Sequence, residues 1–232
     1  MPEVVFVPGF MQRGDAWSPV AERLPEPYPS TLLDHTEHTF EGRLHEIAAA
    51  ADGAVLCGYS LGGRLAIRAA LREPERYPGL VTVGATAGLD QPVARSARRE
   101  ADERLAAWME TAWMKDVVAI WERQPLFADQ SEALIEAQRP GRLSHRPRDL
   151  ALLLRSAGQG ALEPVWFELS QLPMPVLAIA GARDEGYARE ARRIAECAPR
   201  GSVAVVEDAG HAAQLQRPDE LARLLVEFVE RI

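Results

Sequence analysis

The chain has 232 residues, of which 47% are hydrophobic and 26% are charged, and its formal net charge is −8 at pH 7. The hydrophobic share excludes wholesale disorder, and the acidic balance argues against a nucleic-acid or membrane-surface binder, because both partners are polyanionic. Because the chain has neither an apolar run of membrane-spanning length nor a secretory pattern at its N-terminus, we expect a cytoplasmic protein, either a monomer or a small homo-oligomer.

Short apolar runs predict buried strands along the chain. They lie at residues 4–7, 31–33, 54–57, 80–83, 176–180 and 203–206. Stretches with the apolar spacing of helices lie at residues 40–51, 61–71, 187–197 and 219–231. Short, fully apolar strands that alternate with helices form parallel sheets covered on both faces. We therefore expect an α/β fold with a mostly parallel sheet of about six strands flanked by helices.

The alternation of strands and helices stops between residues 85 and 172. This stretch has helical spacing throughout, many arginines and four of the five tryptophans. We therefore predict that residues 1–84 and 173–232 form the α/β core, and that residues 85–172 form a helical lid insertion. Open α/β sheets bind ligands at the carboxyl ends of their strands, so we expect the insertion to lie over that edge.

Residues 58–63, Gly-Tyr-Ser-Leu-Gly-Gly, follow a predicted strand and open a predicted helix. They fit the G-x-S-x-G pattern of a nucleophile elbow, a turn so tight that the neighbours of the serine must be small. The elbow would hold the Ser60 hydroxyl at the N-terminus of the helix, where backbone N–H groups favour developing negative charge. The alternative is a glycine-rich turn with an incidental serine, but the strand before it and the helix after it favour the elbow.

A nucleophilic serine needs a base, and the base needs a group that orients it. On this scaffold the three follow in the chain order Ser, Asp, His. Asp184 comes after the fifth predicted strand, and His211 comes after the sixth. We therefore predict a catalytic triad of Ser60, Asp184 and His211. Asp208 is the alternative acid, although it lies only three residues before the histidine.

An oxyanion hole on this scaffold uses the backbone N–H group after the nucleophile and a second one from the loop after the first strand. The predicted donors are therefore the backbone N–H groups of Leu61 and Phe10. Gly9 would allow a close backbone approach in that loop, but a plain Pro-Gly turn is an equal alternative.

His35 and His38, with Asp34 and Glu37 beside them, could suggest a metal site. No matched second pair of ligands appears, and the spacing is not that of a structural zinc site. We expect no metal here and interpret this loop as part of the pocket mouth. His145 is interpreted as a solvated residue in a polar turn.

The sequence resembles a known family, the 2-succinyl-6-hydroxy-2,4-cyclohexadiene-1-carboxylate synthases of menaquinone biosynthesis, within the α/β-hydrolase superfamily. The resemblance covers most of the chain. It rests on the elbow at 58–64, Gly88-Leu89 with the arginine-rich residues 95–102, residues 121–127, Arg139 with residues 150–160, Gly181-x-x-Asp184 and Gly210-His211. One departure is Pro8-Gly9-Phe10, where the family usually has His-Gly-Phe.

The resemblance implies an α/β-hydrolase fold and a carbon–oxygen lyase. In the family, the triad removes a proton and pyruvate is eliminated from 2-succinyl-5-enolpyruvyl-6-hydroxy-3-cyclohexene-1-carboxylate, with neither a metal nor an organic cofactor. This substrate carries three carboxylates, and each buried carboxylate needs a charge-matched partner. By the motif match, the substrate-binding residues are Tyr59, Arg64, Arg98, Trp121 and Arg139, with Arg99 as the alternative to Arg98.

The sequence leaves two other functions open. The same triad could serve a serine hydrolase of a small carboxylated substrate, either a carboxylesterase or a hydrolase of carbon–carbon bonds. The chain could also be a binding protein without catalysis. The expected partner is a small-molecule polycarboxylate substrate, and neither nucleic acid nor membrane is expected.

Overall fold

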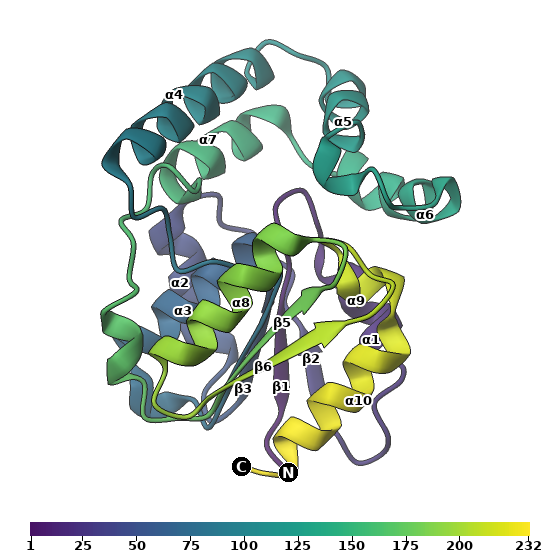
Figure 1. Ribbon diagram of the computed structural model, residues 1–232. Coiled ribbons are helices and arrows are strands. Elements are labelled where there is room, and N and C mark those ends of the chain that lie inside the picture. The colour runs from purple at the N-terminus through teal and green to yellow at the C-terminus, as the bar shows by residue number, and fades with distance from the viewer.

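Six strands form one parallel sheet in the computed structural model, which describes residues 1–232 (Figure 1). Their order is β2-β1-β3-β4-β5-β6, and every neighbouring pair is parallel. Every residue of the four central strands is buried, as expected of apolar runs without alternation. The strands are β1 (Val4–Val7), β2 (Ser30–Leu32), β3 (Val55–Tyr59), β4 (Leu80–Val83), β5 (Val176–Gly181) and β6 (Gly201–Val206).

Helices cover both faces of this sheet, as Figure 1 shows. A parallel sheet of apolar strands needs both layers, because neither of its faces can be left in water. One face packs against α2 (Phe40–Ala50), α3 (Leu61–Arg72) and α8 (Glu185–Cys197). The other face packs against α1 (Ser18–Ala21), α9 (Ala213–Gln216) and α10 (Pro218–Val229). Two short 3-10 turns, η1 (Gly14–Trp17) and η2 (Pro74–Arg76), lie in the connections.

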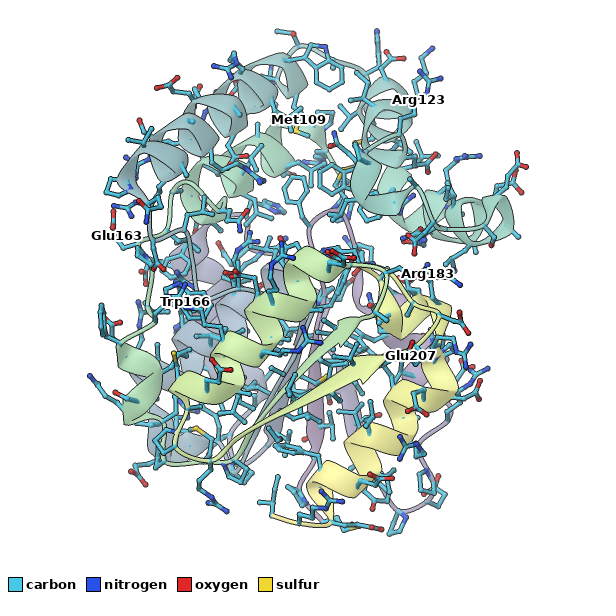
Figure 2. The ribbon with its side chains drawn as sticks, in the orientation of Figure 1. Met109, Arg123, Glu163, Trp166, Arg183 and Glu207 are labelled. Atoms are coloured by element: carbon cyan, nitrogen blue, oxygen red, sulfur yellow. The ribbon has the colours of Figure 1, made fainter.

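Four further helices, which we call the lid helices, lie beyond the carboxyl ends of the strands (Figure 1). Three of them, α4 (Pro92–Met109), α5 (Met114–Glu122) and α7 (Pro147–Ala157), share an apolar cluster with Met11 from the loop after β1. Met109 of this cluster points into the space beneath α4 (Figure 2). The lid helices therefore rest on the core at the edge where open α/β sheets bind ligands. The fourth lid helix is α6 (Glu132–Leu143), and the 3-10 turn η3 (Pro125–Phe127) follows α5.

The last part of the predicted insertion packs with the core. Residues 158–172 contain no α-helix, only the 3-10 turn η4 (Glu168–Gln171), and they run back along the side of the sheet (Figure 1). Trp166, labelled in Figure 2, and Leu172 are buried in the same cluster as α3 and α8. Helical structure throughout residues 85–172 is therefore a wrong expectation for this segment, because its apolar side chains fill the core.

Local signals explain where several elements begin. The Thr39 hydroxyl accepts a hydrogen bond from the Gly42 N–H at the start of α2 (3.1 Å), as an N-cap residue does. The edge strand β6 begins before its apolar run, at Gly201, because the first residues of this strand are exposed and need no apolar side chains. None of the helices combines the length and the apolar character that a membrane crossing requires.

Candidate active site

Ser60 lies in the sharp turn between β3 and α3. Its backbone φ of 51° and ψ of −108° are strained for a residue with a side chain. The turn can close because its neighbours are glycines. A Cβ atom on Gly62 would lie 2.2 Å from the carbonyl oxygen of Val7, and one on Gly58 would lie 2.4 Å from the carbonyl oxygen of Gly62. The structure therefore has the predicted elbow as a backbone geometry, with the serine at the carboxyl edge of the sheet.

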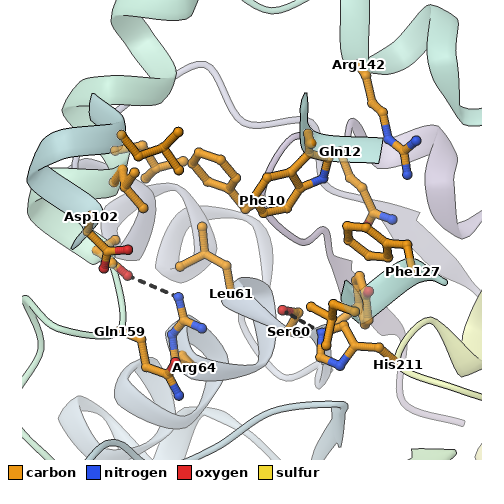
Figure 3. A pocket seen from close by; sticks show the side chains of 18 of the residues that line it. Phe10, Gln12, Ser60, Leu61, Arg64, Asp102, Phe127, Arg142, Gln159 and His211 are labelled. Atoms are coloured by element: carbon orange, nitrogen blue, oxygen red, sulfur yellow. Dashed lines mark hydrogen bonds between the residues drawn. The ribbon is translucent and has the colours of Figure 1, made fainter. Parts of the chain in front are cut away.

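The structure brings the side chains of Ser60, His211 and Asp184 together, and Figure 3 marks the contact between the first two. The distance from Ser60 Oγ to His211 Nε2 is 3.2 Å, and the distance from His211 Nδ1 to Asp184 Oδ2 is 2.8 Å. A carboxylate only accepts hydrogen bonds, so the neutral imidazole carries its proton on Nδ1 and leaves Nε2 to accept the serine proton. Asp184 is also the N-cap of α8, where its Oδ1 accepts from the Tyr187 N–H (3.2 Å). The backbone therefore fixes the acid that orients the imidazole.

Asp208, the alternative acid, lies outside this arrangement. Its side chain is 66% exposed and pairs with Arg183 (2.8 Å) and Arg217 (3.8 Å). Its backbone φ of 58° belongs to the turn between β6 and His211. The geometry therefore selects Asp184 as the partner of the imidazole.

The two predicted oxyanion donors, Leu61 and Phe10, line the same pocket as Ser60. Neither backbone N–H group donates to another backbone group, so both are available to a negatively charged oxygen of a ligand. In the same loop, the Gly9 N–H donates to Gln12 Oε1 (3.1 Å). A Cβ atom on Gly9 would lie 2.7 Å from the Tyr59 ring, so only glycine lets this loop pack directly on the tyrosine.

A pocket of about 800 Å³, counted with its open mouth, lies at Ser60 between the core and the lid helices (Figure 3). Three guanidinium groups line it, and the only carboxylate in the lining is that of Asp102, so the pocket suits an anionic ligand. The lining residues from the core are Phe10, Gln12, Tyr59, Ser60, Leu61, Arg64, Tyr187 and His211. Those from the insertion are Arg98, Asp102, Leu105, Trp121, Leu126, Phe127, Gln138, Arg142, Leu153, Leu154, Ala157, Gly158 and Gln159.

Arg64 lies one helical turn after Ser60 and lines the pocket, as the motif match predicted, and only 8% of it is exposed. Its Nη2 donates to the Ala157 carbonyl (3.2 Å), while its Nε is buried without a partner. Burial lowers the pKa of Arg64, although a guanidinium in a protein stays charged at neutral pH. The structure therefore places a charged group with unused donors next to the serine.

Arg98 reaches the pocket from α4. It donates to Asp102 Oδ1 (2.7 Å) and to Gln159 Oε1 (3.1 Å). Its neighbour Arg99 donates instead to the Gly160 carbonyl (3.1 Å) and does not line the pocket. The structure therefore resolves the alternative between these two arginines in favour of Arg98.

Arg139 does not reach the pocket. Its side chain is 43% exposed and pairs with Glu122 (2.8 Å). Arg142, one turn further along α6, lines the pocket instead, with 3% of its side chain exposed and its Cζ 5.7 Å from the centroid of the Phe127 ring. The prediction that Arg139 lines the pocket is therefore corrected. Arg142 lines it instead, because this residue near the C-terminal end of α6 faces the pocket.

Aromatic side chains surround the imidazole. The centroid of the His211 ring is 4.4 Å from that of Tyr187 and 5.4 Å from that of Tyr59. Trp121, also predicted at the pocket, packs against Phe10 at 5.1 Å between ring centroids. Burial raises the pKa of both tyrosines, so their hydroxyls remain protonated and can donate to a ligand.

Sequence reasoning missed several lining residues, among them Asp102, Phe127, Gln138 and Tyr187. Tyr187 carried a usable signal, because it lies three residues after Asp184 in the first turn of α8. The other three carried none, since an acid, an aromatic residue and an amide on lid helices are ordinary residues until the packing is known.

The remaining histidines lie away from this pocket. His35 is 6% exposed, and its Nδ1 lies 2.7 Å from Glu46 Oε2. Burial, with Arg13 and Arg43 nearby, lowers the pKa of His145 to about 4. The interpretations of His35 as a pocket-mouth residue and of His145 as a solvated one are therefore wrong. No group of three or more His, Cys, Asp or Glu side chains is arranged to hold a metal ion.

A serine in contact with an imidazole that a carboxylate holds, at the carboxyl edge of a parallel sheet, defines the class of α/β enzymes with an elbow nucleophile. In a comparison with known protein families, residues 4–224 match the alpha/beta hydrolase family. The chain belongs to the alpha/beta hydrolase family, which confirms the predicted fold class, and it is an enzyme of that family.

Individual relatives carry names that are more specific than the name of the family. A Bacillus subtilis (strain 168) protein, provisionally named 2-succinyl-6-hydroxy-2,4-cyclohexadiene-1-carboxylate synthase, is 32% identical over 180 residues, which are 76% of this chain and 66% of that protein. The synthase of that name from Citrobacter koseri is 27% identical over 242 residues, which are 97% of this chain and 94% of the relative. The resemblance to these synthases that the motifs predicted is therefore confirmed.

Solved structures share the fold. MenH from S. aureus superposes with a TM-score of 0.90 at 23% identity, covering 99% of this chain and 94% of that chain. A thermophilic esterase from Thermogutta terrifontis, with malate bound, gives a TM-score of 0.74 at 21% identity, covering 100% and 90%. The same fold thus accommodates proteins with different names, so the function must be argued from the site.

Proposed function

We propose that this protein is a carbon–oxygen lyase of menaquinone biosynthesis. It eliminates pyruvate from 2-succinyl-5-enolpyruvyl-6-hydroxy-3-cyclohexene-1-carboxylate and forms 2-succinyl-6-hydroxy-2,4-cyclohexadiene-1-carboxylate. The observation that carries the proposal is that Arg64, Arg98 and Arg142 line the pocket that holds Ser60. Such a substrate has three carboxylates, and each needs a charged partner when it leaves water. The names of the relatives support the identity of the substrate.

The contact between Ser60 and His211 supports a proton abstraction. His211 Nε2 accepts the serine proton, and Ser60 Oγ removes the proton from ring carbon 2, which the adjacent succinyl ketone acidifies. A double bond then forms between ring carbons 2 and 3, and the ring double bond moves to carbons 4 and 5. The bond from carbon 5 to the enolpyruvyl oxygen breaks, and the released enolpyruvate takes up a proton to become pyruvate. No water is consumed.

Charge develops at two places during this step. The ketone oxygen gains enolate character, and the Leu61 and Phe10 N–H groups are the donors available to stabilise it. The His211 imidazole becomes an imidazolium, and the Asp184 carboxylate at 2.8 Å stabilises that charge. In this proposal the triad therefore acts as a base assembly, and no acyl-enzyme is formed.

Pyruvate release, coupled to the oxidation of NADH by lactate dehydrogenase, tests the proposal. We expect Ser60→Ala to lower kcat by about 10²- to 10⁴-fold with little change in KM, because the base is lost while the arginines remain. Ser170→Ala, at an exposed serine in η4, is the control and should match the wild type. If the wild type cleaves short p-nitrophenyl esters at ordinary enzyme rates and releases no pyruvate, the proposal is wrong and a serine hydrolase is favoured.

A further inference from the structure

Glu122, the last residue of α5, is a nearly buried carboxylate that contacts two arginines without lining the pocket. Its side chain is 9% exposed. Its Oε1 accepts from Arg142 Nη1 (3.0 Å), and its Oε2 accepts from Arg139 Nη2 (2.8 Å) and Nε (3.2 Å). A carboxylate leaves water at little cost only when it is paired and hydrogen-bonded in this way. The three side chains are therefore one unit that joins α5 to α6.

Arg142 is fixed on further sides. Its Nη2 donates to Gln138 Oε1 (2.8 Å), and Gln138 Nε2 donates in turn to Gln130 Oε1 (3.0 Å). Its guanidinium lies over the Phe127 ring, as Figure 3 shows. A guanidinium has five N–H groups, and these contacts use one on each terminal nitrogen. The remaining donors are available to a ligand in the pocket that Arg142 lines.

The charges of this unit decide how Arg142 acts. Two guanidinium groups and one carboxylate leave one net positive charge at the pocket. Without Arg139, the whole charge of the Glu122 carboxylate would act on Arg142, and this would weaken the attraction of Arg142 for an anion. Without Glu122, two cations would face each other where their shared acceptor had been, and Arg142 would be repelled from its place.

We propose that Glu122 and Arg139 are positioning residues for Arg142. The carboxylate fixes the Arg142 guanidinium at the pocket wall, and Arg139 shares the carboxylate's charge, so that Arg142 can bind a carboxylate of the substrate. The inference rests on the proposed function for the identity of that substrate. It also gives Arg139, which the motif match placed at the substrate, a role that acts through Glu122.

Steady-state kinetics of pyruvate release test this role. Glu122→Gln keeps the shape of the side chain and removes its charge, and we expect it to raise KM about tenfold while kcat changes less than about threefold. Arg139→Gln should raise KM about threefold, because Glu122 then neutralises Arg142 alone. Glu136→Gln makes the same charge change at an exposed position of α6 without contacting Arg142, and should match the wild type.

A double variant separates positioning from a general structural effect. In an Arg142→Gln background, Glu122→Gln should cause no further increase in KM, because the residue that it positions is already gone. A wild-type KM for Glu122→Gln would overturn the proposal. An equal further loss in the Arg142→Gln background would also overturn it, since Glu122 would then act independently of Arg142.

Side-chain NMR provides a readout that does not depend on the reaction. The Arg142 Nε–H signal, assigned by its loss in Arg142→Gln, should show a reduced heteronuclear NOE in Glu122→Gln and stay ordered in Glu136→Gln. An unchanged signal in Glu122→Gln would contradict the positioning role. If the wild type releases no pyruvate, the proposed function fails, and the NMR comparison still decides whether Glu122 positions Arg142.

Discussion

Arg64 is buried although no carboxylate of the protein pairs with it. The Ala157 carbonyl accepts one of its hydrogen bonds, and its Nε has no partner. Burial is the main cause of its lowered pKa, and the nearby Arg98 guanidinium acts in the same direction. A buried cation with unused donors is unfavourable for the fold itself. The carboxylate of a ligand in the pocket would satisfy it, so we expect Arg64 to serve binding.

Arg64→Met tests this expectation, because methionine retains the apolar bulk of the side chain and removes the charge. We expect kcat/KM for pyruvate release to fall by about ten- to 150-fold, which corresponds to about 1.5–3 kcal/mol for a charged hydrogen bond. Thermal unfolding should show a melting temperature no lower than that of the wild type, since the buried charge is gone. Arg72→Met, at an exposed arginine of the same helix that pairs with Glu41, is the control. An unchanged kcat/KM would remove Arg64 from the site.

The triad and Arg64 could be predicted to the residue, whereas the arginines of the lid helices could be predicted only to the helix. Ser60, Asp184 and His211 follow strands of one parallel sheet, and the carboxyl ends of parallel strands meet at one edge. On a lid helix, by contrast, neighbouring turns of the same face differ only in what packs above them. Arg139 and Arg142 both contact Glu122, and only the packing of α6 on the core decides that Arg142 reaches the pocket.

At the scale of elements, the four central strands were predictable because burial on both faces leaves a short apolar run as their signature. The secondary structure of the insertion was harder to predict. Helical spacing correctly indicates α4–α7, but Trp166 and Leu172 show the same apolar character in a segment that is not helical. Tertiary contacts with α3 and α8 place that segment along the core, and a sequence pattern does not report which partner an apolar side chain will meet.

The junction between α6 and α7 contains a histidine that is held neutral. Burial is the main cause that lowers the pKa of His145, and the cations Arg13 and Arg43, with His38, act in the same direction against the opposing charge of Asp34, so that the pKa falls to about 4. These groups come from the loop after β1, from the loop after β2 and from α2, so the lid helices meet three parts of the core here. Protonation of His145 would place another positive charge among them.

This geometry predicts a pH dependence of stability. The unfolded chain binds a proton at His145 near its ordinary pKa of 6.5, whereas the folded protein binds it only near pH 4. The stability is therefore complete above pH 6.5 and is lost as the pH falls toward 4, by less than about 1.4 kcal/mol per pH unit from this residue. Urea unfolding between pH 7 and 4.5 should show a shallower loss in His145→Gln than in the wild type. His45→Gln, at an exposed position of α2, is the control, and equal slopes for His145→Gln and the wild type would contradict the prediction.

At the scale of the whole molecule, the site exists only where the core and the lid helices meet. Ser60 and His211 belong to the core, whereas Arg98 and Arg142 belong to the lid helices. The protein carries a net charge of −8, yet three of its guanidinium groups gather in one pocket. Charge focused in a cleft can attract an anion even when the overall charge opposes it. The position of the lid helices on the core therefore decides whether the three guanidinium groups of the pocket lie together.

A chain of hydrogen bonds joins the segment between η3 and α6 to the loop that carries His211. Gln216 of α9 accepts from the Gly210 N–H (2.8 Å) through its Oε1 and donates to Asp129 Oδ2 (3.0 Å) through its Nε2. Asp129 lies between η3 and α6, and Gly210 directly precedes His211. Asp129→Ala would remove the contact on the lid side and leave the hydrogen bond at the histidine loop intact.

Hydrogen–deuterium exchange should then show where this contact acts. Because an exposed hydrogen bond contributes about 0.5–1 kcal/mol, we expect the amides of residues 121–131 to exchange about two- to fivefold faster in Asp129→Ala. Peptides from the central strands should exchange as in the wild type, since a local opening of the lid helices leaves the sheet closed. Glu136→Ala removes an acid at an exposed position of α6, the helix that follows Asp129, and should have no effect. Unchanged exchange at residues 121–131 in Asp129→Ala would contradict the prediction and leave the hold on the lid helices to other contacts, among them the apolar packing around Met11 and Met109.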